Sequence, residues 1–328
     1  MVKSQIPSGG VTLKAPKKRS LLQRLYRDRM FLLMALPGIL FLLVFAYLPM
    51  GGVLVAFKKM TFNQSNFVLN FLHSQWIGTK NFDFFFKSPD AFRVTRNTVL
   101  YNLMFIVSGL VASVFVAISA SEIFSKRATK FYQSVMILPA FLSWVIVSYL
   151  LYSFLNPTYG FINTTLKSMG LGTVSWYQDQ KFWPFIFLFL NLWKNVGLSS
   201  IYYFAAISGI DPEMYQSAQI DGATRWKQIL HITIPCLRPT MIILTILSLG
   251  GIIRSDFGLF WVATLNLGKG SLFNIGSTID TYIYSALINN GSISLAAASG
   301  LYQSIVGFIM IVGANFIVRR IDPEYAIF

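Results

Sequence analysis

Six long apolar segments constrain this chain more than any other feature of its sequence. Four of them, residues 30–57, 97–121, 132–155 and 293–318, contain no Asp, Glu, Lys or Arg. A helix needs about 20 apolar residues to cross the hydrocarbon core of a bilayer, and lipid offers no partner for unpaired backbone groups. We therefore predict an all-α polytopic membrane protein with six spans. These spans are placed at residues 30–57, 97–121, 132–155, 183–207, 240–264 and 293–318.

The composition narrows the function. Charged residues make up 12% of the chain, against about 25% in soluble domains. A single cysteine excludes a disulfide framework. His73 and His231 fall in different predicted loops, so no metal site is expected. The sequence contains no G-x-x-x-x-G-K-[ST] phosphate-binding motif. We therefore expect no cofactor in this chain, and any ATP would be bound by another subunit.

The lysines and arginines of the loops predict the orientation, because cytoplasmic loops carry an excess of them. With the N-terminus inside, the inner segments hold 16 such residues and the outer loops hold 9. We therefore expect cytoplasmic tails at residues 1–29 and 319–328. Residues 21–29 form either an interfacial helix on lipid phosphates or a plain topogenic tail. Much of the net charge of +15 is thus topogenic and does not indicate nucleic-acid binding.

A polar island at residues 211–239 separates the fourth and fifth predicted spans. Asp211 is a good N-cap, and a proline follows it at the first helical position. We expect a helix to about Asp221, a sharp turn at Gly222, and a second helix that stops before Pro235. An ordered polar segment between two spans indicates a contact with a partner outside the membrane.

This island resembles the EAA loop of binding-protein-dependent ABC importer permeases. The resemblance is carried by Gln216-Ser217-Ala218, Asp221-Gly222-Ala223, Trp226, Ile232-Thr233-Ile234-Pro235 and Pro239. Gln216 stands where the family has a glutamate, which removes the charge-assisted form of its hydrogen bonds. The resemblance implies that Met214 and Tyr215, together with these residues as far as Trp226, form a coupling helix that docks on an ATPase subunit. We also expect Trp226 and Ile229 to anchor the island against its own spans.

The resemblance also implies the partners and the cellular location. These are a second homologous permease, two ABC ATPase subunits that bind ATP and Mg, and an extracellular or periplasmic solute-binding protein. The chain would lie in the bacterial plasma (inner) membrane as a multi-pass, non-catalytic subunit. Residues 280–284 and 300–307 resemble the subgroup that imports oligosaccharides derived from complex polysaccharides, including uronate-containing ones.

Polar residues inside the predicted spans indicate a translocation path. Lys194 and Arg254 are intramembrane cations, and such residues usually face a bundle interior or a cavity. Asn191, Lys194 and Asn195 share one helix face by their spacing. Because Arg254 and Asp256 do not face each other on a regular helix, we expect a break near residue 258. The candidate path residues are Ser143, Asn191, Trp193, Lys194, Asn195, Ser248, Arg254 and Asp256.

Two interpretations of these polar residues stay open at this point: they contact a sugar, or they bridge helices. The two intramembrane cations and a basic first outer loop suit an anionic glycan, which we hold as a hypothesis. The alternative function is a stand-alone secondary transporter or channel, which would show inverted repeats and mid-span acids. Asp256 is the one strong mid-span acid in the predicted spans.

Overall fold

The computed structural model describes residues 29–62, 66–123, 125–265, 270–321 and 323. The basic tail at 1–28 and most of the C-terminal tail therefore lie outside the described residues. The chain divides into two compact units, residues 1–53 and 54–328, which are described separately.

The described part of the first unit is one apolar helical run. It consists of α2 (Arg29–Leu42), a π-helical turn (Leu43–Tyr47) and α3 (Leu48–Met50), and it leads into a 3-10 segment (Gly51–Phe57). None of the residues of α2 is buried. A helix that is apolar all round and unburied in its own chain suits a lipid or protein environment.

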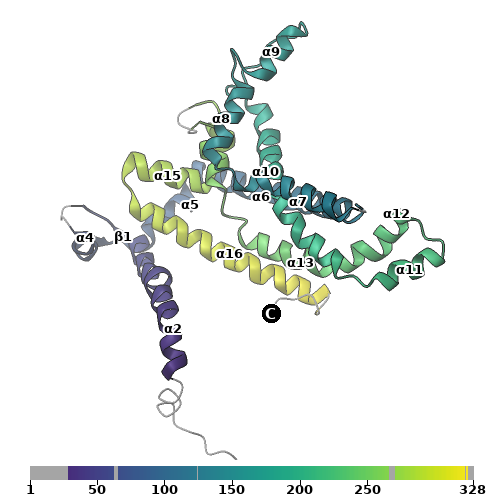
Figure 1. Cartoon of the computed structure of the whole chain (residues 1–328). Coiled ribbons are helices and arrows are strands. Elements are labelled where there is room, and N and C mark those ends of the chain that lie inside the picture. The colour runs from purple at the N-terminus through teal and green to yellow at the C-terminus, as the bar shows by residue number, and fades with distance from the viewer. Residues whose placement is uncertain (1–28, 63–65, 124, 266–269, 322, 324–328) are drawn as a thin grey trace, which may run out of the picture. The chain divides into compact units, whose positions relative to one another are not determined.

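The second unit contains the remaining elements (Figure 1). They are β1 (Lys58–Lys59), α4 (Phe67–His73), β2 (Gln75–Trp76), α5 (Asp83–Lys87), α6 (Pro89–Ser121), α7 (Lys126–Phe141), α8 (Trp144–Leu155), α9 (Phe161–Ser168), α10 (Trp183–Ser208), α11 (Pro212–Ile220), α12 (Arg225–Gln228), α13 (Ile234–Gly250), α14 (Phe273–Gly276), α15 (Ile279–Asn290) and α16 (Ile293–Ile321). The antiparallel pair β1–β2 aligns Lys58 with Trp76. The fold is all-α, as predicted.

The long helices of this unit surround two apolar clusters. Helix α10 packs along α6 and α7, and α13 packs along α16. One cluster is centred on Trp183, Phe187 and Phe260, and the other on Val94 and Ile279. Among the described residues of the whole chain, five helical segments are long and apolar enough to cross a membrane. A sixth is obtained if one bent helix pair counts as a single span.

The bent pair is the third predicted span. Helices α7 and α8 meet at an angle of 95°, which the sequence did not predict beyond an interruption at Pro139. Ser143 begins α8 as its N-cap, and its Oγ accepts a hydrogen bond from the backbone N–H of Ile146 at 3.3 Å. A local cap satisfies one of the helix-start donors and lets a new helix begin in a new direction.

The fifth predicted span, residues 240–264, is wrong at both ends. A helical segment runs from Arg225 to Gly250 straight through Pro235 and Pro239, whereas we expected a stop before Pro235. A π-helical turn (Ile229–Thr233) ends two residues before Pro235. Wide turns of this kind accommodate a ring that cannot donate a backbone hydrogen bond.

The C-terminal end of that span is broken, as the sequence indicated, although the break comes earlier than residue 258. Helix α13 ends at Gly250, and a second π-helical turn begins at Gly258 (Gly258–Val262). At Gly250 the backbone of α16 comes very close: a Cβ built on Gly307 would lie 2.6 Å from the Gly250 carbonyl oxygen. Small residues at helix contacts permit such an approach in membranes.

Three further boundaries differ from the prediction. Helix α6 begins at Pro89 rather than at residue 97, because Ser88 caps it and a proline fits the first helical position. The two predicted outer loops at 156–181 and 265–292 contain helices α9 and α15. The sixth predicted span corresponds to α16.

Candidate functional site

The polar island folds as a helix, a tight turn and a helix. Asp211 caps α11, and its Oδ1 accepts a hydrogen bond from the Glu213 N–H at 2.9 Å. Gly222 follows the helix at φ +74°. Its N–H donates to Gln219 at 3.0 Å, and the Ala223 N–H donates to Ala218 at 2.8 Å. This is the Schellman arrangement, in which a left-handed residue turns the chain sharply.

Two side-chain contacts hold the island in its conformation. The Tyr215 hydroxyl and Thr233 Oγ1 lie 2.9 Å apart. Gln228 is buried, and its Nε2 donates to the Ala223 carbonyl at 3.1 Å. The first contact joins the two arms across the turn, and the second fixes the start of the second arm, so the island is a preformed element. Figure 1 shows α11 and α12 projecting together beyond the ends of α10 and α13.

The exposed face of the island corrects one expectation. We predicted that Trp226 and Ile229 anchor the island against its own spans. Trp226 is instead 69% exposed, and Ile220 on α11 is 87% exposed. Gln216 is exposed as well. Large exposed apolar side chains on a polar projection are typical of a protein-docking surface, and the contact that joins the two arms is the one between Tyr215 and Thr233.

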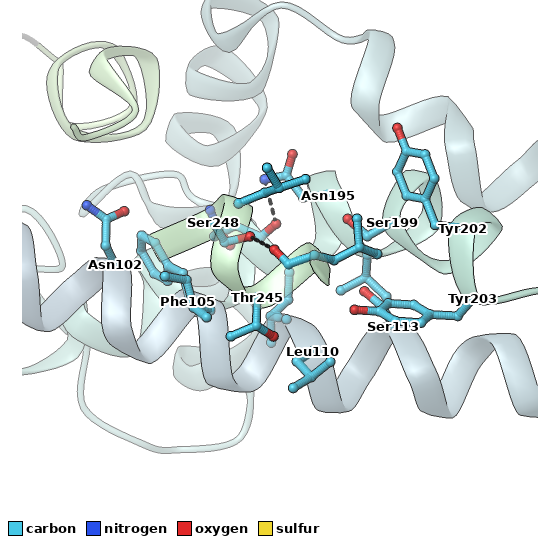
Figure 2. Close-up of a pocket in the computed structure, with 17 residues that line it drawn as sticks. Asn102, Phe105, Leu110, Ser113, Asn195, Ser199, Tyr202, Tyr203, Thr245 and Ser248 are labelled. Carbon is cyan, nitrogen blue, oxygen red and sulfur yellow. Dashed lines mark hydrogen bonds between the residues drawn. The ribbon is translucent and has the colours of Figure 1, made fainter. Parts of the chain in front are cut away.

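A cavity of about 500 Å³ lies between α6, α10 and α13. Figure 2 shows Asn102 near one end and Tyr202 and Tyr203 near the other, with Asn195 and Ser248 between them. None of the described residues that line it is charged. Its polar lining consists of Asn102, Ser113, Asn191, Asn195, Ser199, Tyr202, Tyr203, Thr245 and Ser248.

Three of the predicted path residues line this cavity: Asn191, Asn195 and Ser248. The rest of the polar lining was not predicted from the sequence. Ser199 was open to detection, because it continues the i, i+4 spacing of Asn191 and Asn195. Asn102 could not be detected in this way, because one neutral amide does not stand out within a long apolar segment.

Lys194 does not line the cavity, contrary to expectation. Its ammonium group is turned to the end of α7, where it donates to the carbonyls of Pro139 at 3.3 Å and Ala140 at 3.1 Å, and to that of Leu142. The residue is only 9% exposed. The carbonyls at a helix C-terminus lack intrahelical partners and carry partial negative charge, so a cation is favourable there.

The other predicted residues lie around the helix breaks. Trp144 Nε1 donates to Asp256 Oδ2 at 3.0 Å, and Asp256 Oδ1 accepts from the Leu259 N–H at 3.2 Å. The Arg254 side chain is exposed, and its carbonyl accepts from Asn102 Nδ2 at 2.7 Å. Ser143 is a helix cap. Trp193 lines a separate apolar groove between α8 and α10.

No group of three or more His, Cys, Asp or Glu residues that could hold a metal ion occurs within the described ranges. The site offers amides, hydroxyls and aromatic rings around a cavity, and a rigid apolar projection at a distance from it. Such a site can hydrogen-bond a polar ligand reversibly, and the described residues present no arrangement for bond-breaking chemistry.

Comparison with known proteins identifies the family. Residues 109–324 match the model for the "binding-protein-dependent transport system inner membrane component". The chain is 34% identical to protein LplB of Bacillus subtilis strain 168 over 95% of both chains. It is 29% identical to the polygalacturonan/rhamnogalacturonan transport system permease protein YteP of the same organism, over 96% of this chain and 95% of that protein.

A solved structure agrees with these sequence relatives. The chain superposes with a TM-score of 0.81 on a chain of a bacterial ABC transporter involved in the import of the acidic polysaccharide alginate. The two are 33% identical, and the match covers 92% of this chain and 99% of that chain. These relatives decide against the stand-alone secondary transporter or channel. The chain therefore belongs to the binding-protein-dependent inner membrane components, the multi-pass, non-catalytic permease subunits of ABC importers.

Proposed function

We propose that this permease moves an oligosaccharide through the cavity between α6, α10 and α13. The observation that carries the proposal is the lining, which combines amide and hydroxyl groups with tyrosine rings and bears no charge on its described residues. Sugar hydroxyls both donate and accept hydrogen bonds, as do amides and hydroxyls. Aromatic faces suit the apolar faces of sugar rings. The names of YteP and of the alginate transporter chain support this substrate class.

The oligosaccharide is anionic in our proposal. The cavity itself supplies no cation, so recognition of negative charge falls to Arg254, whose carbonyl is bonded to the cavity-lining Asn102. The Arg254 guanidinium is exposed and forms no ion pair with any carboxylate among the described residues. Its backbone is held in place by Asn102, which lines the cavity. A cation so placed would meet a uronate group at the entrance to the cavity.

The assembly in this proposal has a second, homologous permease that completes the path and two ATPase subunits that bind ATP. A solute-binding protein delivers the sugar. The island of α11 and α12 docks in a cleft of one ATPase, and closure of the ATPases moves the island and rocks the permease between its two states. The excess of 16 inner over 9 outer basic residues supports cytoplasmic termini and a cytoplasmic island.

The test uses the full complex in proteoliposomes with its binding protein. Uptake of a galacturonate pentasaccharide should exceed uptake of a neutral pentasaccharide, and Arg254→Gln should reduce that preference. Arg320→Gln, on the last turn of α16, is the matched control and should leave it unchanged. A preference for the neutral sugar would refute the anionic substrate. Purification of the chain alone with ion-driven uptake would refute the assembly.

A further inference from the structure

A chain of contacts links the two helix breaks to the two amide-bearing walls of the cavity. It starts at Lys194, which lies on α10 between Asn191 and Asn195. Because the Lys194 ammonium binds three carbonyls at the end of α7, the rotation of α10 about its axis is fixed at this level. That rotation is what presents Asn191 and Asn195 to the cavity.

Trp144 is the second link. Its indole ring lies beside the Lys194 ammonium, at 5.3 Å from the ring centroid. Its Nε1 donates to Asp256 Oδ2 at 3.0 Å. The ring also packs against Gly258 so closely that a Cβ at that position would overlap it. One residue therefore contacts the break of the third span, the cation on α10 and the break of the fifth span.

The broken part of the fifth span completes the chain of contacts. Asn102 Nδ2 donates to the carbonyls of Ile252 at 2.9 Å and Arg254 at 2.7 Å. Asn102 lines the cavity from α6, opposite the α10 residues. Displacing residues 252–256 would therefore displace the amide of Asn102.

We propose that Lys194, Trp144 and Asp256 are positioning residues that set the distance between the α10 amides and Asn102, and thereby select the oligosaccharide length. This inference rests on the proposed function. A buried cation is costly in a membrane protein and an apolar side chain of similar volume would pack there without that cost. The Lys194 ammonium and the Asp256 carboxylate both contact the Trp144 indole. Their effect on the geometry of the cavity explains this arrangement better than packing does.

The experiment compares uptake of galacturonate tri- and pentasaccharides by the complete complex in proteoliposomes. Trp144→Phe removes the indole donor and keeps an aromatic ring. We expect the half-saturating concentration of the preferred length to rise roughly tenfold, as befits the loss of one hydrogen bond to a charged group. The ratio between the two lengths should fall, while the yield of assembled complex and the maximal rate of ATP hydrolysis stay unchanged.

Two controls separate positioning from stability. Trp176→Phe removes another indole hydrogen bond, to Asn163 at 3.1 Å in the outer loop, and should leave the length preference intact. Asp256→Asn keeps an acceptor for Trp144 and should retain more of the preference than Asp256→Ala. If the Trp144→Phe variant does not assemble into the complex, the comparison of Asp256→Asn with Asp256→Ala tests the proposal instead.

The proposal is overturned if Trp144→Phe and Trp176→Phe have equal effects, or if yield falls while the length preference stays constant. Equal length preferences in the two Asp256 variants would overturn it as well. If the unmodified complex transports neither sugar, the proposed function fails, and this inference fails with it.

Discussion

Replacing Gly222 tests whether the turn of the island transmits movement between the subunits. The residue has φ +74°, and a Cβ placed there would meet nothing within 4 Å. The cost of a substitution therefore comes from backbone conformation alone. Left-handed geometry costs an ordinary residue about 1–2 kcal/mol, and asparagine tolerates it better. Proline cannot adopt a positive φ and would also lose the N–H that donates to Gln219 at 3.0 Å.

These values predict an order of effects. An increase of about 1–2 kcal/mol in the free energy of the turn lowers its population relative to alternative conformations by about five- to thirtyfold. Gly222→Asn should therefore remain close to the unmodified protein, Gly222→Ala should be impaired, and Gly222→Pro should be uncoupled. The assay is stimulation of ATP hydrolysis by sugar-loaded binding protein, measured beside the amount of ATPase that copurifies. Normal stimulation in Gly222→Pro, or equal loss in the asparagine and alanine variants, would refute the reasoning.

Three further predictions concern other parts of the chain. Gly307→Ala should lower the free energy of unfolding by about 1–3 kcal/mol, because the methyl group would press on the Gly250 carbonyl; Gly313→Ala on the same helix meets open space and should show no loss in thermal unfolding in detergent. Gln216→Glu changes an exposed residue and should strengthen ATPase copurification in low salt without altering the unfolding temperature; a lowered unfolding temperature would contradict this. Asn163→Ala removes hydrogen bonds to the backbone of residues 156, 157 and 174, so limited proteolysis should cut the loop at residues 156–181 faster than in the unmodified chain, and an unchanged rate would contradict the role of Asn163 in ordering this loop.

Helix caps and turns could be predicted from the sequence, because interactions between residues close in the chain determine them. Asp211 as a cap and Gly222 as a left-handed turn were readable because each satisfies helix-end groups within a few residues. The all-α class followed from the lengths of the apolar segments alone. The course of the helix through Pro235 was not readable, because a π-helical turn is set by packing and leaves no compositional signal.

The candidate site was predicted in part. Asn191 and Asn195 lie about 40° apart around a helix, whereas Lys194 lies about 60° from one and 100° from the other. Spacing placed all three on one broad face, but only the neighbours decide where that face ends. Lys194 binds carbonyls at the end of α7, whereas the amides of Asn191 and Asn195 line the cavity. The contribution of Asn102 depended on a contact between residues 150 positions apart in the sequence.

The 95° bend in the third span has a consequence for how this protein is powered. A helix that ends within a span leaves bare carbonyls and a partial charge of roughly −0.5 at its terminus. In many secondary transporters such an interrupted end is where the driving sodium ion or proton binds. Here the ammonium of Lys194 is a covalently attached substitute for that ion. The chain supplies its own covalently attached counter-ion at this position, so this helix end leaves no open site for a sodium ion or proton.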